Sequence, residues 1–484
     1  MSHRRRTTAS LCAIASTVSL TAVFLPAAAA QDLPAPGSSD VASSIESSLP
    51  GSHVPDLTGT DGPKNIIYLV GDGMGYNHIA ATNLFETGQT KHQVEGEAGD
   101  VSPVEGGEAA QVYEGDEWNE LAMSTFQEGN SYDPEKAWND HDYVNEDYTD
   151  SAAAGTAMAT SSKTENGMIG VTSDGATVQN TSEHAIDNGK SAGVVSSVPF
   201  NHATPAAWAA HNDDRNDFHA MADEMIGGDL DVIMGAGHPL YDEDNQPVDE
   251  PNYEWISEES FTELSAGETD FTYLEEDADF QTLADGDVEA GEKYFGLPQV
   301  ASTLQHNRSG DSAVPYDTEL NDVVDMSTMA EGALNILDQN DEGFHVMIEG
   351  GVIDWAGHAN DAGPTDDPSW SAMTGQAGEM PEHSWHSENH TNQLVPVFFR
   401  GGGSKDITTA ATGVDPVRGN YIDNVDIANL TLNTWWGNQR RFRQRKRPDV
   451  WNTHIGPFDR RVAGRLPTVS RRSVRTPARQ VRRR

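Results

Sequence analysis

The sequence predicts an α/β fold in which helices cover a mostly parallel central sheet. Short apolar runs that stop at glycine or polar residues recur along the chain, as buried parallel strands do. Helical stretches at 217–225 and 326–337 separate some of these runs, and such alternation is typical of layered α/β proteins. The predicted strands span residues 65–70, 193–200, 230–234, 345–348 and 394–399.

The segment before the predicted domain has the composition of an export signal followed by a linker. Three arginines at 4–6, an apolar run at 11–25 and alanines at 27–30 predict a signal peptide over residues 1–30. Paired arginines favour the twin-arginine route, although the residues after Arg6 match that pattern poorly. Residues 31–62 are rich in Ser, Pro, Gly and Asp and predict a flexible linker. We therefore expect a secreted, extracellular or periplasm-like protein whose folded domain spans residues 63–437.

The chain is strongly acidic. Its 484 residues include 30 Lys+Arg against 77 Asp+Glu, for a formal net charge of -47. Such a surface repels phosphate backbones and anionic lipid, so we expect the acidic body to bind neither nucleic acid nor membrane. The scarcity of lysine predicts adaptation to high salt, with a merely acidic secreted protein as the alternative. Residues 238–292 are very acidic without clear periodicity and predict a surface insertion.

The end of the chain reverses this composition. Residues 439–484 hold 16 of the 30 basic residues and only two acids. One interpretation is an arm that binds polyanions. The preferred hypothesis is an out-of-frame reading of GC-rich coding DNA. Either way, residues 438–484 predict a basic, disordered tail. The single cysteine, Cys12, lies in the signal, so a mature chain would contain no thiol.

Clusters of polar residues directly follow the predicted strands. In open parallel sheets, functional residues lie at the carboxyl ends of the strands. Asp72 lies between two glycines and is either a metal ligand or a turn aspartate bonded to its own backbone. Ser151 begins a helix of small residues, and a helix N-terminus suits both an anion and a serine alkoxide. The alternative for Ser151 is a simple capping region.

Two further clusters follow later strands. His202 and Thr204 precede Arg215, one of four arginines between residues 31 and 438. The guanidinium of Arg215 has the geometry to bind a phosphate or a carboxylate. The alternative is an ion pair with Asp213 or Asp214.

The last cluster combines carboxylates and imidazoles. Asp354 and His358 are four residues apart, so on a helix they share one face and form a partial zinc site. His390 lies just before the predicted strand 394–399 and would complete this zinc set. Glu349, at a strand end, offers a hard oxygen to Mg²⁺. The alternative is an unconnected histidine and aspartate.

Taken together, five sequence blocks resemble the alkaline phosphatase family in order and spacing. The blocks are NIIYLVGDGMG at 65–75, TDSAAAGTAM at 149–158, HATPAA at 202–207, MIEGGVIDWAGHAND at 347–361 and HTNQLVPVF at 390–398. The resemblance covers residues from about 64 to 436. It implies a three-layer αβα sandwich and an enzyme that hydrolyses phosphate monoesters through a phosphoserine. The resemblance leaves a homodimer open.

The resemblance also implies a role for each candidate residue. Ser151 would be the nucleophile, and Arg215 would clamp two phosphate oxygens. The implied metal sites are Asp354, His358 and His390 for a first Zn²⁺, Asp72 between a second Zn²⁺ and Mg²⁺, Glu349 and Thr204 for Mg²⁺, and His202 beside that site.

One part of the family pattern is missing. The second zinc of the family also takes an Asp-His pair from a strand between the counterparts of His358 and His390. Residues 359–389 contain no apolar run and no Asp-His dipeptide, which indicates that a helix and a strand are absent. The alternative function is therefore a catalytically impaired or inactive homologue that binds phosphate or metal. A change of substrate to diesters or sulfates is a third hypothesis. Substitute ligands in the segment would be Asp361, Asp366, Asp367, His383 and His386.

Overall fold

The structure is a computed structural model that describes residues 62–310, 320–359, 369–381 and 389–437. The predicted signal peptide, nearly all of the linker, the basic tail and the five substitute ligands lie outside the described residues. None of the described helices is long and apolar enough to cross a membrane.

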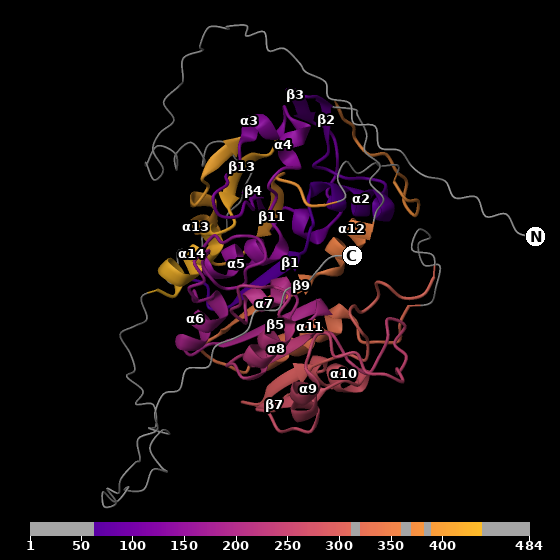
Figure 1. The fold of residues 1–484 in the computed structure, drawn as a ribbon. Coiled ribbons are helices and arrows are strands. Elements are labelled where there is room, and N and C mark those ends of the chain that lie inside the picture. Colours follow the sequence, from indigo (N-terminus) through magenta and orange to yellow (C-terminus); the bar gives the residue numbers. More distant parts are fainter. Residues whose placement is uncertain (1–61, 311–319, 360–368, 382–388, 438–484) are drawn as a thin grey trace, which may run out of the picture. The chain divides into compact units, whose positions relative to one another are not determined.

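A six-stranded parallel sheet forms the centre of the described fold, in the order β1-β9-β5-β6-β8-β7 (Figure 1). Four of these strands were expected from apolar runs, and β5 shows why: every residue after its first is buried. The mixed α/β class with a parallel central sheet is thereby confirmed. The strands are β1 (Ile66–Gly71), β5 (Ser191–Pro199), β6 (Val232–Ala236), β7 (Phe271–Leu274), β8 (Lys293–Gly296) and β9 (Phe344–Gly350).

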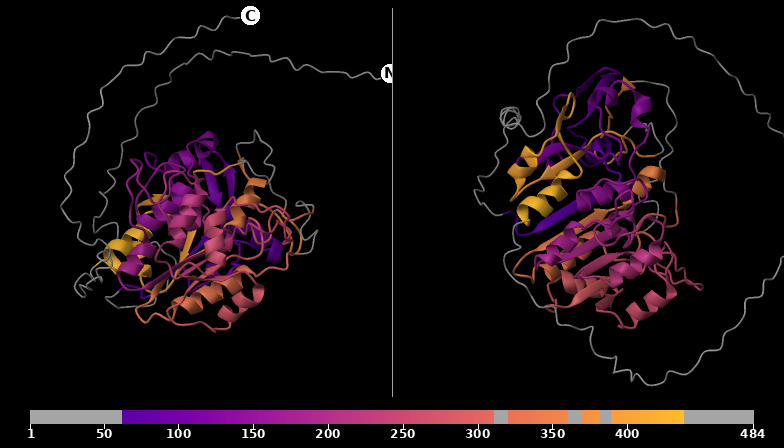
Figure 2. Two further views of the ribbon diagram at one scale, coloured as in Figure 1. Left: turned by 60° about the horizontal axis from the view of Figure 1, so that its bottom comes forward. Right: turned by 60° about the vertical axis from the view of Figure 1, so that its left-hand side comes forward.

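Helices cover both faces of this sheet. Neighbouring side chains of a strand point to opposite faces, and here they enter two different hydrophobic cores. Val194 packs with helices α5 to α9, whereas Val195 packs with α10 and α11. The sheet is thus the middle of three layers (Figure 2). The covering helices are α5 (Ser151–Thr160), α6 (Thr181–Asp187), α7 (Ala203–Ala207), α8 (Phe218–Ile226), α9 (Glu258–Ser265), α10 (Asp277–Ala284) and α11 (Met326–Leu337).

The acidic segment 238–292 is not the surface insertion that its composition predicts. It contains β7, the outermost strand of the central sheet, and the helices α9 and α10. Phe280 of α10 and Leu264 of α9 are fully buried. The segment shows little periodicity because α10 buries only Phe280 and Leu283, while its remaining residues face outward and include the acids.

A second sheet has the order β11-β4-β13-β12 and combines residues from distant parts of the chain. The apolar run at 394–399 forms β11, which pairs antiparallel with β4 and does not enter the central sheet as expected. Residues 421–436 begin in β13 and continue as α14 and the π-helix η2. The bounds are β4 (Asn119–Ser124), β11 (Val395–Phe399), β12 (Gly413–Asp415), β13 (Gly419–Asp423), α14 (Asp426–Asn429) and η2 (Leu430–Trp435).

The remaining elements surround these two sheets. A small third sheet has the order β10-β2-β3. Its strands and the other helices are β2 (Val94–Glu97), β3 (Asp100–Pro103), β10 (Ser369–Trp370), α2 (Tyr76–Thr87), η1 (Val112–Glu114), α3 (Pro134–Ala137), α4 (His141–Val144), α12 (Val352–Ala359) and α13 (Ser404–Thr409).

Strand β1 lies at the edge of the central sheet, and one of its faces is exposed. Ile66, Tyr68 and Val70 pack into the core that contains α5, whereas Ile67 and Leu69 are 49% and 64% exposed. Within the described residues, no strand pairs with the outer edge of β1. In the part of the chain that the structure describes, the strand expected to be buried is therefore covered on one face only.

We predict that Leu69→Lys changes the free energy of unfolding by less than about 1 kcal/mol, because its side chain is largely in water. The matched change Ile233→Lys places a charge at a fully buried position of β6 and should cost more than about 3 kcal/mol. Urea unfolding measures both. A loss above about 3 kcal/mol for Leu69→Lys would mean that a segment outside the described residues covers this face.

Candidate active site

The polar clusters expected at strand ends converge because their strands are neighbours. β1, β9 and β5 are adjacent and parallel, so their carboxyl ends meet at one edge of the sheet. Asp72 directly follows β1, Glu349 lies near the end of β9, and His202 follows β5. The same edge receives α12, which begins two residues after β9 ends.

Ser151 lies at the start of α5, hydrogen-bonded to the carboxylate after β1. Its hydroxyl is 3.0 and 3.1 Å from the two side-chain oxygens of Asp72, to which it donates. Asp72 therefore accepts a hydrogen bond from Ser151, whereas the alternative interpretation had it bonded to its own backbone in a turn. The helix cap is Asp150, whose side chain accepts from the backbone N–H of Ala153 at 2.8 Å. Ser151 is thus free of capping and 7% exposed.

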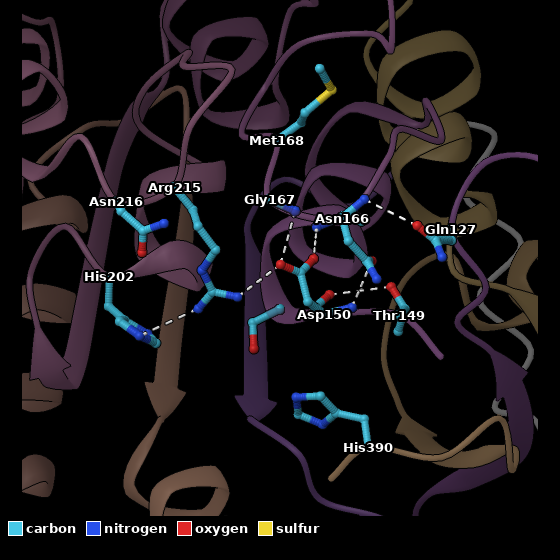
Figure 3. Close-up of polar contacts among 12 residues, drawn as sticks. Gln127, Thr149, Asp150, Asn166, Gly167, Met168, His202, Arg215, Asn216 and His390 are labelled. Atoms are coloured by element: carbon cyan, nitrogen blue, oxygen red, sulfur yellow. Dashed lines mark hydrogen bonds and ion pairs between the residues drawn. The ribbon is translucent and has the colours of Figure 1, made fainter. Parts of the chain in front are cut away.

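Asp150 also holds Arg215, as Figure 3 shows. Arg215 Nη1 donates to Asp150 Oδ2 at 2.9 Å, and the same oxygen accepts from the backbone N–H of Gly167. Arg215 Nη2 is 3.5 Å from His202 Nε2. The expected alternative, an ion pair of Arg215 with Asp213 or Asp214, is not what the structure contains. Arg215 instead lies beside the N-terminus of α5, so the charge of its guanidinium and the dipole of the helix both contribute positive potential there.

Asp354, His358 and His390 form a group with the donor atoms of a zinc site. Their ligand atoms all lie within 4.8 Å of one another. Asp354 Oδ1 is 3.4 Å from His358 Nε2 and 3.7 Å from His390 Nδ1. The spacing of four on α12 aligns the first pair, and the segment before β11 supplies His390. One carboxylate and two imidazoles are a donor set that zinc prefers.

Gly73 allows Asp354 to approach the end of β1. Its φ of +63° lies in the left-handed region, and a Cβ at this position would be 2.6 Å from Asp354 Oδ1. Any other residue would therefore push the carboxylate away. Close packing against Asp354 therefore requires the glycine after Asp72.

Glu349 and Thr204 each keep a buried oxygen that has no hydrogen-bond partner beyond the contact between these two side chains. These atoms are Glu349 Oε1 and Thr204 Oγ1. Glu349 Oε2 accepts from the hydroxyl of Ser196 at 2.5 Å, and the two residues are opposite each other in the β5–β9 register. A fully buried carboxylate oxygen without a partner is costly unless a cation is nearby. Two such oxygens fit Mg²⁺, which prefers hard oxygen ligands.

Buried carboxylates in this region carry pKa values above their usual range. Burial, and then the charge of Asp354, raise the pKa of Asp72. Burial, and then the charge of Asp72, raise the pKa of Glu349. Asp72 thus interacts with the carboxylates of both candidate metal groups. Burial and the charge of Arg215 lower the pKa of His202 to about 3, so this imidazole is neutral. The excess of buried negative charge favours cations here.

A cavity of about 410 Å³ is lined by Ser151, Arg215 and the group Asp354, His358 and His390, whereas Asp72, Glu349 and Thr204 are not part of its lining. The lining residues are Ser151, His202, Arg215, His306, Asn307, Asp354, Trp355, His358 and His390. Three of them were not candidates in the sequence: His306, Asn307 and Trp355. The loop that carries His306 follows no strand-end motif, whereas Trp355 is adjacent to Asp354 and could have been included on that ground.

Two supporting residues were also missed, and both had a signal. Asp150 directly precedes Ser151 in a motif already singled out. Ser196 interrupts the apolar run of β5 with a hydroxyl, which indicates a polar partner inside the sheet. Among the described residues there is one group of three metal-binding side chains. The five substitute ligands expected for the second zinc site lie outside the described residues, so their role stays a prediction.

This arrangement is that of an α/β protein with candidate metal ligands beside a helix-terminal serine. The sequence profile of the alkaline phosphatase family matches residues 63–365. The chain therefore belongs to the alkaline phosphatase family, and the resemblance found in the sequence is confirmed.

Relatives of this chain carry the same family name. It is 29% identical over 304 residues to Alkaline phosphatase 4 of Bacillus subtilis (strain 168), which covers 62% of this chain and 53% of that protein. It is 27% identical over 339 residues to the alkaline phosphatase of Gadus morhua, covering 61% of each chain. The chain thus spans about half to three-fifths of the length of these relatives.

Solved structures give weaker similarity. The cold-active alkaline phosphatase of Shewanella sp. is 28% identical, with a TM-score of 0.42, over 61% of this chain and 58% of that one. The alkaline phosphatase of the Antarctic bacterium TAB5 is 20% identical, with a TM-score of 0.49, over 78% of this chain and 100% of that one.

Proposed function

We propose that the protein is a secreted, salt-adapted phosphomonoesterase that hydrolyses phosphate monoesters through a phosphoserine. One observation carries this proposal: Ser151 starts α5, donates to Asp72 and shares a cavity with Arg215 and the group Asp354, His358 and His390. Membership of the alkaline phosphatase family supports the reaction class. Secretion rests on the composition of residues 1–30.

In the proposed reaction Ser151 Oγ attacks phosphorus, and the bond from phosphorus to the alcohol oxygen breaks. The alcohol leaves with a proton, and water then attacks the phosphoserine to release inorganic phosphate and free Ser151. Asp72 accepts the hydrogen bond of the Ser151 hydroxyl, so its carboxylate is in position to take the proton that Ser151 loses and to pass it to the leaving alcohol. Arg215 and the N-terminus of α5 favour negative charge on the equatorial phosphate oxygens.

Two groups of residues fit the metals of the family. Asp354, His358 and His390 fit Zn²⁺ by donor type, and the buried oxygens of Glu349 and Thr204 fit Mg²⁺. When bound, such cations lower the pKa of a coordinated hydroxyl and stabilise charge on the leaving oxygen.

One observation favours the alternative, a homologue that binds metal or phosphate without turnover. Within the described residues only one group of three metal-binding side chains is present. A protein with a single zinc site would lack one of the two cations that bracket an in-line displacement.

Hydrolysis of nitrophenyl phosphate at alkaline pH and high salt, with zinc and magnesium supplied, tests the proposal. We expect nitrophenol release that depends on both metals and stops when a chelator is added. Nitrophenyl sulfate and bis(nitrophenyl) phosphate serve as controls and should react far more slowly. No turnover in a protein that retains one zinc would establish the alternative function, and faster cleavage of either control would establish the third hypothesis.

Salt dependence tests the proposed adaptation. Residues 31–438 contain many more acids than bases, and their mutual repulsion is screened as the Debye length falls from about 10 Å at 0.1 M to about 3 Å at 1 M salt. We predict that the thermal unfolding midpoint rises steadily with NaCl into the molar range. A less acidic phosphatase of the same family is the control. A midpoint that responds to NaCl no more than the control does would refute salt adaptation.

A further inference from the structure

A row of rings lines one wall of the active-site cavity. The ring of His202, beside Arg215, is 5.5 Å from that of Trp355. The ring of Trp355 is 6.5 Å from that of His306, and both contacts are edge to face. All four residues line the cavity that contains Ser151. The wall therefore continues from the proposed phosphate-binding arginine through three successive rings.

Hydrogen bonds hold the backbone next to His306, the last ring of this row. The hydroxyl of Thr303 donates to the carbonyl oxygen of His306 at 2.7 Å. The side chain of Gln305 accepts from the backbone N–H of Asn321 at 2.9 Å and donates to its carbonyl oxygen at 3.1 Å. Asn307 has a φ of +64°, a conformation that asparagine tolerates better than most residues. These bonds hold the backbone that carries His306 before any ligand binds, which reduces the entropy lost on binding.

The chemistry of this wall suits the alcohol part of a substrate and not its phosphate. Burial and the charge of Arg308 lower the pKa of His306, so its imidazole is neutral at neutral and alkaline pH. A neutral imidazole and an indole attract a dianion weakly, whereas both pack well against planar apolar groups. The phosphate already has Arg215 and the N-terminus of α5 in the same cavity.

We propose that Trp355 and His306 form the subsite for the alcohol part of the substrate, and that this subsite favours phosphate monoesters of aromatic alcohols over those of short aliphatic alcohols. This inference rests on the proposed function, because it assigns the leaving-group side of the same site. Ring contacts are the expected source of the preference, since each aromatic pair adds about 0.5–1.5 kcal/mol beyond its buried area, equivalent to roughly two- to twelvefold in affinity.

Binding to the Ser151→Ala protein, with zinc and magnesium supplied, tests the subsite without turnover. Calorimetry would compare phenyl phosphate, glycerol phosphate and inorganic phosphate. We expect phenyl phosphate to bind more tightly than glycerol phosphate, and His306→Ala, made in the same background, to reduce this ratio by roughly three- to tenfold. The affinity for inorganic phosphate should stay within twofold. His306→Phe keeps a ring and should retain the preference.

The matched control is His219→Ala, which removes an exposed histidine of α8 that does not line the cavity. It should leave all three affinities unchanged. Should the alanine variant not fold, His306→Gln provides the same loss of the ring with a polar side chain of similar length. Equal affinity for phenyl and glycerol phosphate in the Ser151→Ala protein would overturn the inference. So would a His306→Ala or His306→Gln variant that keeps the ratio, or a His306→Phe variant that loses it.

The binding experiment tests the subsite separately from the hydrolysis experiment that tests the proposed function. Failure of the proposed function would appear as an absence of hydrolysis by the unsubstituted protein. Failure of the subsite would appear as an absence of preference in binding, which is measured on a protein that cannot form a phosphoserine. A protein without turnover that still prefers phenyl phosphate would support the subsite and refute the enzyme.

Discussion

Ser151→Ala is expected to lower kcat for nitrophenyl phosphate by roughly 10³-fold or more, because the alanine side chain has no nucleophile that could form the covalent intermediate. The Ser151 hydroxyl donates to Asp72 and takes no part in the group Asp354, His358 and His390, so bound zinc should not change. Steady-state kinetics and metal analysis of the purified protein measure the two effects. Incubation with labelled phosphate should leave label on serine in the unsubstituted protein only.

Ser327→Ala is a matched control for this prediction. Ser327 lies in the first turn of α11, which is capped by Asp325 much as α5 is capped by Asp150. It is exposed and does not line the cavity, so its kcat should equal that of the unsubstituted protein. Turnover that is unchanged in Ser151→Ala would overturn the phosphoserine mechanism. Loss of zinc from that variant would assign its effect to a damaged metal site instead.

Asp354→Ala should have the next largest effect, on zinc affinity and through it on kcat. Asp354 Oδ1 is the atom that both imidazoles approach, at 3.4 and 3.7 Å. Removing it leaves two neutral donors, and we expect zinc affinity to fall by at least about 100-fold, since even outer-shell partners cost 10- to 100-fold. Metal content after dialysis against a weak chelator measures this loss, and kcat at limiting zinc should fall with it.

In the metal-free protein, Asp354→Ala should not lower the stability, in contrast to its effect on zinc affinity. The charge of Asp354 raises the pKa of Asp72, so its removal relieves repulsion between buried carboxylates. The metal-free variant should therefore be no less stable in urea than the metal-free parent. Asp338→Ala, at the exposed C-cap of α11, is the control and should retain zinc. Full zinc content in Asp354→Ala would exclude this residue as a ligand.

Much of the fold follows from local pattern. The helix expected at 326–337 is α11, and that at 217–225 is α8 with Asp217 as its cap, because amphipathic spacing and a capping aspartate are properties of consecutive residues. The acidic segment was misjudged for the same reason. Its helices bury two side chains each, which is too weak a periodic signal to recognise among so many acids.

The candidate site was predictable to the extent that it lies at strand ends. Asp72, Glu349 and His202 each follow or end a parallel strand, and neighbouring parallel strands bring such residues together whatever the loops do. The clamp of Arg215 by Asp150 joins residues 65 positions apart, and His306 reaches the cavity on a loop outside every motif. Such contacts depend on loop paths, which residue order alone does not reveal.

The apolar strand runs, the small-residue helix after Asp150 and the five motif blocks were sufficient for the α/β class, the family and the candidate residues, because each is encoded in residues adjacent along the chain. Three features needed the folded structure: the exposed face of β1, the entry of the acidic segment into the central sheet, and the ring-lined wall of the cavity. Each depends on which segments pack side by side. That choice is made by the summed burial of many residues at once and not by any local pattern.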